Sequence, residues 1–552
     1  MAMKINSAGV SVRAVGRDER DNAFLEMIVL VGGRRTREII ALDDFASSSD
    51  RLMANLGAIT PDARRQCREA IQYAHRTMEP SFCVATFPGF SGRAFVMPDG
   101  SVIGDAADLR VRLPVGRGDI GSDGETTGTL RRWKRLAALA EGNTRLMLAI
   151  ATAMCGPVLA LLKDVEPLMI QLVGPREAGK STIAGFAASV WGAPTPLTWS
   201  GTINSIEEAA STRNATCIVL DELGVFNWNQ PKAYETFREA VMRIFEGVEK
   251  GRMNQAVARR WRLGLFSTAN VLINQIASAR GIDLSDERHL ALVSRLVDVP
   301  LPARAFGAYE NLHGSATVAE FAGRVKRGLA RHHGHAGRAL VDGMLKWREG
   351  HADPVKAWLR ERRRLYIARA GERIALPAGA ESARVSGSFA TIYASGRLGI
   401  EIGVLPWDVR KFGSAIIACE QAHAALTTLS AGGSLPDTTL RSPMEALRRH
   451  VEQHKGELVD LREGLVRDVE HNHRACAGYI NQHRDGVLEL LLSNKTLHRI
   501  CCSNARLNLL RNKLRAEDIL RPGRRPAVKR PVMKGRDRVH VIAVRADAFG
   551  VM

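Results

Sequence analysis

The sequence is poor in aromatic side chains and lacks paired cysteine motifs. Aromatic residues make up 5% of the 552 residues, and the eight cysteines occur without a single Cys-x-x-Cys pair. This absence argues against a zinc ribbon and against a dithiol redox motif. Several cysteines stand in apolar runs, where we expect them to be small buried side chains. Because the N-terminus has no secretory signal pattern, we expect a reducing, cytoplasmic environment.

Long hydrophobic runs are also missing. A membrane-spanning helix needs about 20 apolar residues. The candidate run, Leu146 to Leu162, is at the short limit and is broken by Gly156-Pro157. We therefore expect a buried helix or helix pair here, and no association with a membrane.

Several catalytic signatures are absent as well. The sequence has no kinase, deaminase or dinucleotide-binding signature, no local Ser-His-Asp arrangement and no repeat of fixed period. Histidines cluster at 332–335 and 471–473, but no acidic or cysteine partner stands at a suitable spacing for a metal site. Charge and phosphate-binding patterns are therefore the informative features.

Positive charge is in clear excess. Lys and Arg number 78 against 58 Asp and Glu, which gives a formal net charge of +20. Such a chain favours a polyanionic partner, with nucleic acid before an anionic membrane surface. The alternative is only a well-solvated basic surface. Half of the excess lies in residues 441–552, which hold 23 Lys/Arg and 13 Asp/Glu.

The strongest pattern is a phosphate-binding loop. A predicted apolar strand over 168–173 leads into GPREAGKS, which matches GxxxxGK[ST], and a predicted helix over 182–191 follows. Glycines let backbone N–H groups close around a phosphate at a helix N-terminus. We expect Lys180 to bridge the β- and γ-phosphates of ATP, and the Ser181 hydroxyl to bind Mg²⁺. The residues expected to contact the nucleotide are Gly174, Pro175, Arg176, Glu177, Ala178, Gly179, Lys180, Ser181 and Thr182.

A second pattern is an apolar strand that ends in two carboxylates, the Walker B form. Residues 216–220 are followed by Asp221 and Glu222, some forty residues after the loop. We expect Asp221 to hold Mg²⁺ through water and Glu222 to polarise the attacking water. An adjacent acidic pair favours an ATP hydrolase of the additional-strand class over a P-loop kinase.

Two further positions are candidates for sensing the nucleotide. Asn270, with Thr268 second, follows a predicted strand over 263–267 and would lie at the carboxyl edge of the sheet, where ligands bind. The alternative is a simple strand-end cap. Arg295 precedes the last predicted core strand, 297–301, and could reach the ATP of a neighbouring subunit as an arginine finger. The alternative is an ion pair with Asp286, Glu287 or Asp298.

Two basic segments are candidate nucleic-acid contacts. The first lies between the Walker B strand and the sensor strand, where a basic hairpin could follow a phosphate backbone. The second is 521–538, with eight basic residues and three prolines, between predicted helices and a predicted strand over 539–544. This order suggests a winged helix. A solvated charged loop is the alternative for the first segment. The residues expected to contact DNA are Lys250, Arg252, Arg259, Arg260, Arg524, Arg525, Lys529 and Arg530.

Composition and pattern divide the chain into five parts. We expect a small α+β N-terminal domain over 1–115, with a hairpin formed by strands at 23–31 and 36–42. The other parts are a Gly-rich linker over 116–128, an α/β P-loop ATPase core over 129–310 with a parallel sheet, a helical lid or post-ATPase region over 311–440, and a basic C-terminal domain over 441–552.

The motif set resembles a known family. From 146 to 300 the chain is similar to the AAA+ domain of helicases from phages, plasmids and cassette-chromosome elements, a family filed as a domain of unknown function. The segments that carry the resemblance are GPREAGKST, FAASVWG, TCIVLDELG, GVEKGRM, WRLGLFSTAN and SRLVDVP, in that order. Residues 82–104 and 389–407 resemble the parts of that family before and after the ATPase core.

The resemblance implies an AAA+ ATPase related to the superfamily-3 and MCM-like hexameric helicases. It implies that Lys180, Ser181, Asp221 and Glu222 serve ATP and Mg²⁺, that Asn270 stands at the sensor position and that Arg295 is the finger. The chain departs from the pattern at Ser388, where an arginine is expected, so Arg384 and Arg397 are substitutes for a second sensor.

The leading hypothesis is an ATP-dependent DNA helicase or translocase of a mobile genetic element. It would act as a homo-oligomeric ring, with a hexamer favoured, in replication or mobilisation. Two rivals stay open: an ATP-switched DNA-binding initiator or loader that does not unwind, and a phage-defence NTPase.

Overall fold

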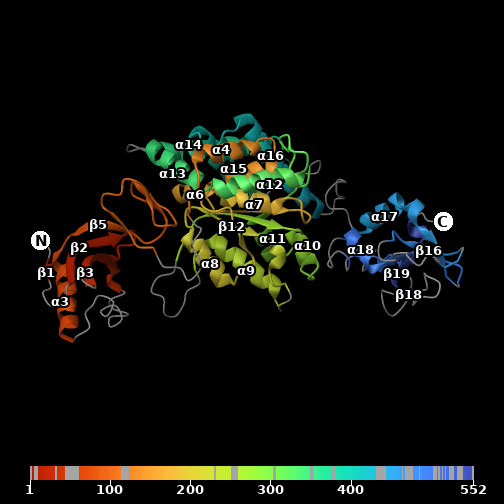
Figure 1. The fold of residues 1–552 in the computed structure, drawn as a ribbon, viewed down its shortest axis with the longest axis horizontal. Helices are drawn as coiled ribbons and strands as arrows, with labels where there is room; N and C mark the ends of the chain where they lie inside the picture. Colours follow the sequence, from red (N-terminus) through yellow and green to blue (C-terminus); the bar gives the residue numbers. More distant parts are fainter. Residues whose placement is uncertain are drawn as a thin grey trace. The chain divides into compact units, whose positions relative to one another are not determined.

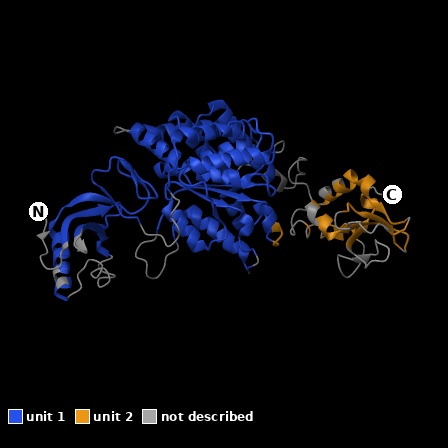
Figure 2. Ribbon diagram, in the orientation of Figure 1, with its two compact units in different colours: residues 1–277, 282–431 blue, residues 278–281, 432–552 orange. Residues whose placement is uncertain are grey.

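The computed structural model divides the chain into two compact units, one of residues 1–277 with 282–431 and one of residues 278–281 with 432–552 (Figure 2). The structure describes residues 3–4, 10–31, 34–43, 61–113, 124–228, 230, 232–249, 259–302, 306–348, 353–374, 379–430, 443–462, 464–465, 476–483, 485–501, 507, 510–511, 514–515, 517–520, 528–530 and 539–549.

The N-terminal part of the first unit is a mixed sheet covered by one helix. Its strand order is β4-β3-β2-β5-β9, with β1 paired to β2. The predicted hairpin is confirmed, because β3 and β4 pair antiparallel along their length, although Gly32 and Gly33 lie outside the described residues. The elements are β1 (Met3–Lys4), β2 (Val10–Asp18), β3 (Ala23–Val31), β4 (Arg34–Ala41), α3 (Pro61–Thr77), β5 (Pro80–Ala85) and β9 (Leu109–Val111).

A small antiparallel sheet connects this part to the main core. It consists of β6 (Gly89–Ser91), β7 (Ala94–Val96) and β8 (Val102–Gly104). Phe95 and Met97 are fully buried in the main hydrophobic cluster. Asn214, just before a strand of the core, donates through Nδ2 to the Pro88 carbonyl at 2.7 Å. The small sheet is therefore part of the same packed body as the core.

The core is built on a five-stranded parallel sheet, as predicted. The strand order is β11-β12-β13-β10-β14, and every neighbouring pair is parallel. Parallel strands covered on both faces form nearly continuous apolar runs, and all six residues of β10 are buried. The strands are β10 (Leu168–Val173), β11 (Leu197–Thr198), β12 (Cys217–Asp221), β13 (Gly264–Ala269) and β14 (Leu296–Pro300).

Helices cover both faces of this sheet (Figure 1). Side chains alternate along a strand, so Ile170 and Leu172 join one cluster while Met169 and Val173 join the other. On the first face lie α5 (Thr144–Ala153), α6 (Cys155–Leu161) and α7 (Lys180–Ala188). On the second lie α8 (Ile203–Thr212), the one-turn η2 (Leu223–Val225), α9 (Ala233–Glu246), α10 (Ile273–Ser278) and α11 (Glu287–Val293).

A second helical layer lies outside the first face. Helix α12 packs on α7, α15 and α16 pack on α5, and the helices of this layer share the larger cluster, which includes Phe321, Leu340 and Phe389. They are α4 (Leu130–Ala137), η1 (Ala138–Ala140), α12 (Val318–Arg331), α13 (His335–Trp347), α14 (Pro354–Gly371), α15 (Ala380–Glu401) and α16 (Val409–Ser430).

The apolar run at 146–162 forms the buried helix pair that the sequence predicts. Helices α5 and α6 meet at an angle of 45°, and nearly all their side chains are buried. Among the described residues, no single helix has the length and apolar character needed to cross a membrane. Helices α5 and α6 reach that length and apolar character only when they are taken together. Four of the cysteines, Cys67, Cys155, Cys217 and Cys419, are buried in cores.

The second unit is a mixed sheet with helices and has its own hydrophobic cluster. Its strand order is β15-β16-β17-β19-β18. Strand β19 confirms the strand predicted at 539–544. The sequence pattern did not predict β15, β16 or β17. The elements are α17 (Pro443–Gln453), η3 (Lys455–Glu457), β15 (Val459–Asp460), β16 (Tyr479–Gln482), β17 (Leu488–Ser493), α18 (Asn494–Cys501), β18 (Val528–Arg530), β19 (Val539–Arg545) and η4 (Asp547–Phe549).

Candidate functional site

The predicted phosphate loop joins the end of β10 to the start of α7. Helix α7 begins at Lys180, and Gly179 before it has φ +99°, in the left-handed region that favours glycine. A Cβ on Gly179 would lie 2.7 Å from the Tyr309 ring, and one on Gly174 would lie 2.4 Å from Leu301. Both glycines are therefore required by close packing around the loop. Pro175, Arg176 and Glu177 are exposed, whereas Ala178 is buried.

The Lys180 side chain folds back into its own loop. Its ammonium donates to the carbonyls of Gly174 at 2.9 Å and Pro175 at 2.6 Å, and to Oδ1 of Asn270 at 2.9 Å. Burial lowers the pKa of Lys180, while the Glu222 and Asp221 carboxylates act in the opposite direction. A buried ammonium held by three neutral oxygens is placed to exchange them for anionic ones.

The two carboxylates lie at the same edge of the sheet as the loop. The Thr268 hydroxyl hydrogen-bonds Oδ1 of Asp221 and accepts from the Glu222 backbone N–H at 3.0 Å. Nδ2 of Asn270 donates to Oε1 of Glu222 at 2.6 Å. Asn270 therefore links Lys180 to Glu222. Thr268 links Asp221 to β13, the strand that lies between β10 and β12. Both residues that the sequence suggested as sensors lie here.

Arg295 lies at the opposite edge of the sheet from its own loop. It precedes Leu296, which pairs with Met169 at the start of β10, whereas the loop begins after Val173. About five residues of strand, or roughly 15 Å, separate the two positions. Arg295 donates to the Ala291 carbonyl at 2.9 Å, and its guanidinium lies 4.9 Å from the centre of the Phe245 ring.

The alternative carboxylate pairing of Arg295 is not found. Asp286, Glu287 and Asp298 are all described, and none of them forms an ion pair with it. The charged group close to Arg295 is another cation, Arg384. Arg384 donates to Ser294 at 3.2 Å and to Glu166 at 2.8 Å. Burial, and then Arg384, lower the pKa of Arg295.

The two proposed substitutes for a second sensor thus differ in position. Arg384 lies beside Ser294 at the amino edge of the sheet, away from the loop of its own chain. Arg397 is buried on α15, with its Nη2 3.8 Å from Glu401.

A turn at 306–309 supports the loop and was not found from the sequence. Phe306 and Tyr309 form a backbone bridge, and the Ala308 N–H donates to the Ala178 carbonyl at 2.7 Å. The Tyr309 hydroxyl donates to the Gly179 carbonyl at 3.1 Å, and burial raises the pKa of Tyr309 to about 12. The only signal in the sequence is Gly307, which is typical of a turn. Nothing in the sequence connects this turn to a loop 130 residues earlier.

The predicted DNA-contacting residues divide into three groups. Lys250, Arg252, Arg524 and Arg525 lie outside the described residues, and Lys529 and Arg530 lie in β18, whose side chains are not described. Arg259 is held by Glu249, with 3.7 Å between Nε and Oε2. Arg260 is exposed and forms the bridge with Val248 that closes the base of the predicted hairpin.

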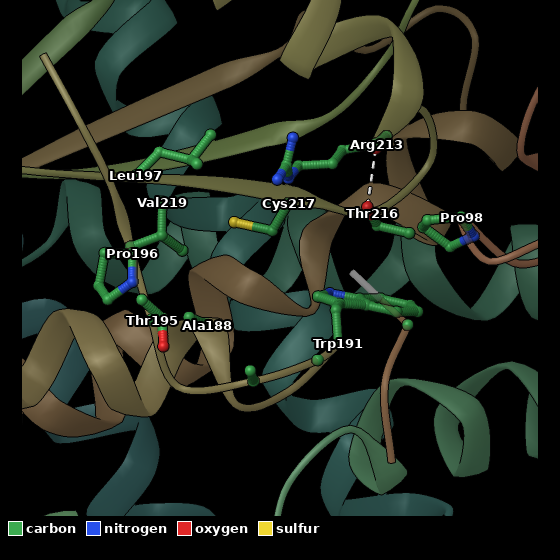
Figure 3. A pocket seen from close by; sticks show the side chains of 13 residues that line it. Pro98, Ala188, Trp191, Thr195, Pro196, Leu197, Arg213, Thr216, Cys217 and Val219 are labelled. Carbon is green, nitrogen blue, oxygen red and sulfur yellow. Dashed lines mark hydrogen bonds between the residues drawn. The ribbon is translucent and has the colours of Figure 1, made fainter. Parts of the chain in front are cut away.

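Away from these groups, a small cavity lies between the end of α7 and β12 (Figure 3). Trp191, Cys217 and Val219 line it, and Thr216 donates to the Arg213 carbonyl at 2.7 Å at its margin. Its volume of about 30 Å³ has room for a water molecule, not for a nucleotide. In the described part of the chain, no three His, Cys, Asp or Glu residues gather into a metal-binding group.

The loop and the Walker B pair both lie within a region that matches a family model. Residues 3–260 match the family described as Domain of unknown function (DUF927). This match covers a little less than half of the chain. The resemblance of the sequence to a family filed as a domain of unknown function is thereby confirmed.

Solved structures extend the comparison beyond the DUF927 region. The structure described as "SCCmec type IV Cch - active helicase" matches with TM-score 0.53 and 18% identity, over 100% of this chain and 97% of that chain. This likeness shows a shared fold. The apo A form of the NrS-1 C-terminal region matches with TM-score 0.24 and 10% identity, over 74% and 92% of the two chains, which is too low for a common overall fold. Among curated proteins, none matches the sequence.

Proposed function

We propose that this chain is an ATP hydrolase that uses the energy of ATP to translocate along or unwind DNA. The observation that carries the proposal is the bridge made by Asn270, which hydrogen-bonds both Lys180 and Glu222. Because Asn270 contacts both the lysine proposed to bind phosphate and the carboxylate proposed to activate water, a change at the nucleotide can reach both side chains through it.

The residues present fit ATP and Mg²⁺. The Lys180 ammonium is buried against uncharged oxygens inside a glycine-containing loop at a helix N-terminus, which favours an anion. Ser181 follows Lys180 and is exposed. Asp221 lies at the end of β12, which is separated from β10 by β13. When bound, Mg²⁺ would neutralise phosphate charge. Lys180 would bind the phosphates, Ser181 and Asp221 would hold the ion, and Glu222 would orient and deprotonate water.

The strand order supports a hydrolase of the AAA+ type. Strand β13 lies between β10, which leads into the loop, and β12, which ends in the carboxylates. An added strand at this place is what distinguishes the additional-strand ATPases from P-loop kinases. It also brings Thr268 and Asn270 between the two catalytic elements.

The position of Arg295 supports a ring. Since Arg295 lies roughly 15 Å from its own loop along the strand direction, an arginine finger at this residue would act on the ATP of a neighbouring subunit. Closed rings place the same two surfaces in contact at every interface. A homo-hexamer is the proposed assembly, by analogy with the related helicases.

The charge of the chain and its fold support DNA as the partner. The chain carries a formal charge of +20. Along its whole length, its fold is similar to that of a structure described as an active helicase. Replication or mobilisation of a mobile element is the proposed setting. A basic winged helix in the second unit is the proposed accessory DNA contact.

The test is hydrolysis and unwinding by Lys180→Ala. Hydrolysis should fall by at least about 100-fold, since a charge-stabilising group of this kind contributes about 10²- to 10³-fold. Lys346→Ala is the matched control, because Lys346 only pairs with Asp342 on the surface. If the wild type hydrolyses ATP without stimulation by DNA and unwinds no forked duplex, the helicase proposal is lost.

A second candidate is an ATP-switched DNA binder that does not unwind. It is favoured by the separate hydrophobic cluster of the second unit, which lies within the basic part of the chain. Deletion of 441–552 separates the two candidates. A channel-based helicase should keep DNA-stimulated hydrolysis, whereas a binder that relies on this unit should lose its DNA affinity.

A further inference from the structure

A groove of about 950 Å³ lies in the first unit, at the edge of the parallel sheet opposite the phosphate loop. Its lining includes Asn214 and Ala215, just before β12, and Arg262, just before β13. It is also lined by residues 84–92 of the N-terminal part and, at the end of α6 and just after it, by Ala160, Leu161, Lys163 and Asp164. The base of the predicted hairpin, Val248 and Arg260, also lines it.

Basic side chains outnumber acidic ones along this groove. Arg262 is used structurally, since it donates to the carbonyls of Leu159, Leu162 and Val165. Six other basic residues face four acidic ones, Asp18, Glu19, Asp164 and Glu246. The six are Arg20, Lys163, Arg260, Arg348, Lys356 and Arg360.

One ion pair of the groove is weak enough to be exchanged, whereas Arg348 and Lys356 both pair with Asp353, whose side chain is 21% exposed. Arg360 and Asp164 are 3.0 Å apart, but their side chains are 55% and 59% exposed. Exposed pairs of this kind contribute about 0–1 kcal/mol. A phosphate with its charged oxygens can therefore replace such a carboxylate at little cost.

Two aromatic rings add a second kind of contact. The Arg20 guanidinium lies 5.4 Å from the centre of the Phe87 ring, and that of Arg348 lies 5.0 Å from the centre of the Phe90 ring. Both rings line the groove and are half-buried. Aromatic rings and guanidinium planes are the surfaces on which unpaired bases stack, at about 1–3 kcal/mol per base.

We propose that this groove binds a single strand of nucleic acid, with its phosphates on the basic side chains and its bases against Phe87 and Phe90. The proposal rests on the proposed function and adds a site, since the sequence assigned nucleic-acid contacts only to the hairpin and the C-terminal segment. A single strand fits better than a duplex, because paired bases cannot reach recessed rings. It fits better than an acidic peptide, because carboxylates make no use of the rings.

The test compares two double charge reversals that change the net charge equally. The groove variant is Lys163→Glu with Arg360→Glu. The control is Arg65→Glu with Arg68→Glu on α3, outside the groove, where Arg65 forms an exposed ion pair with Asp62 much as Arg360 does with Asp164. Thermal melting checks that both variants fold. Binding of a fluorescein-labelled oligo-dT of about 16 nucleotides is followed by anisotropy at several salt concentrations.

The groove variant should bind at least about tenfold more weakly, with a salt slope lower by about 1.4, since each lost phosphate contact on a single strand removes about 0.7. The control should bind within about twofold of the wild type. Phe87→Leu should weaken binding and leave the salt slope unchanged, because it removes stacking and no charge.

The outcomes separate the groove from the proposed function. If the wild type binds the oligonucleotide and hydrolyses ATP but the groove variant binds as tightly as the control, the groove assignment alone is overturned. Competition by poly-glutamate as strong as that by unlabelled oligo-dT would also overturn it, because the site would then be a general polyanion surface. If the wild type binds no oligonucleotide, the proposed function fails as well.

Discussion

At the scale of single residues, the carboxyl edge of the sheet is held together by side-chain amide and hydroxyl groups. Asn270 accepts from Lys180 and donates to Glu222, and Thr268 contacts both Asp221 and the Glu222 backbone. Each charged group in the proposed site is therefore oriented by an uncharged one. Removal of such a group should change catalysis without changing the overall charge.

Asn270→Ala should lower the rate of ATP hydrolysis by about 100-fold, in the range found for a single oriented donor. The reason is that Glu222 and Lys180 lose their common partner, whereas the loop itself stays intact. Steady-state kinetics check this, and the KM for ATP should change much less than kcat. Asn274→Ala is the control, because Asn274 bonds His289 and not the loop. Equal loss in both variants would argue for a general effect on stability.

A buried carboxyl group beneath the site gives a prediction about pH. Asp298 accepts from Gln171 at 2.8 Å and from the Ile273 N–H at 2.7 Å, and Gln171 is in turn bonded by Ser267. Burial raises the pKa of Asp298 from 3.8 to about 7. Between these pH values the folded chain keeps a proton that the unfolded chain releases. The stability that this group contributes is therefore full below about pH 4 and is lost as the pH rises to about 7.

Asp298→Asn should remove this loss. Relative to the wild type, the free energy of unfolding of the variant should rise with pH by at most about 1.4 kcal/mol per unit up to pH 7, and should level off above it. Urea titrations followed by tryptophan fluorescence at pH 5, 6, 7 and 8 measure this difference. Asp283→Asn, at an exposed loop position, should show no such rise. A flat difference for Asp298→Asn would mean that the carboxyl group is already ionised at pH 5.

At the scale of elements, the turn at 306–309 is a brace for the phosphate loop. Gly307 has φ +65°, and a Cβ there would lie 2.6 Å from the Ala178 carbonyl oxygen. Gly314 has φ +79°, and a Cβ there would have nothing within 4 Å. The two glycines therefore carry similar backbone cost on substitution, about 1–2 kcal/mol, and differ only in the clash with the loop.

Gly307→Ala should raise the KM for ATP by at least about tenfold, which corresponds to about 1.4 kcal/mol of binding free energy. Gly314→Ala should leave the KM within about twofold, because its added methyl group meets no neighbour. Nucleotide binding measured by calorimetry gives a direct reading of the same effect. Similar KM values for the two variants would show that the turn does not position the loop.

The sequence predicted the elements that local pattern specifies. The apolar strands 168–173 and 216–220, and the glycine and lysine positions between β10 and α7, were identified because strand, loop and helix signals are adjacent in the chain. It did not predict the turn at 306–309, because its contact with Ala178 depends on how β14 returns beside β10. Nor did it predict β15–β17, since short strands with few β-branched residues, such as 488–493 (LELLLS), resemble helix patterns equally well.

The same limit applies to charged residues. Arg295 was recognised as a candidate from its place before a strand, but its contact with Phe245 and its closeness to Arg384 bring together segments 50 and 89 residues away in the chain. The buried network of Gln171 and Asp298 is likewise invisible in the sequence, where both residues stand inside apolar runs.

At the scale of the whole molecule, the distance between Arg295 and its own loop predicts that two defective chains can complement each other. Lys180→Ala disables the loop and leaves Arg295 intact, and Arg295→Ala does the reverse. In a mixed ring, an Arg295→Ala subunit whose neighbour carries Lys180→Ala would have one complete site between them.

Each variant alone should hydrolyse ATP at about 1% of the wild-type rate or less, given that the loop lysine contributes about 10²-fold or more and a finger about 10³- to 10⁵-fold. Mixed in equal amounts and allowed to exchange subunits, they should regain a clear fraction of wild-type activity. A mixture of Lys180→Ala with Glu222→Gln is the control, since both changes affect the loop side of the interface. No recovery in the first mixture would show that Arg295 does not act between subunits.

Strand β13 joins the groove to the carboxylates at the other edge of the sheet. Trp261 and Arg262, just before its amino end, line the groove, and Thr268 and Asn270 lie at its carboxyl end beside the carboxylates. Six extended residues span about 20 Å, and ladders on both sides prevent the strand from bending. The groove and the carboxylates therefore lie at the two ends of one straight segment of backbone that is paired on both sides.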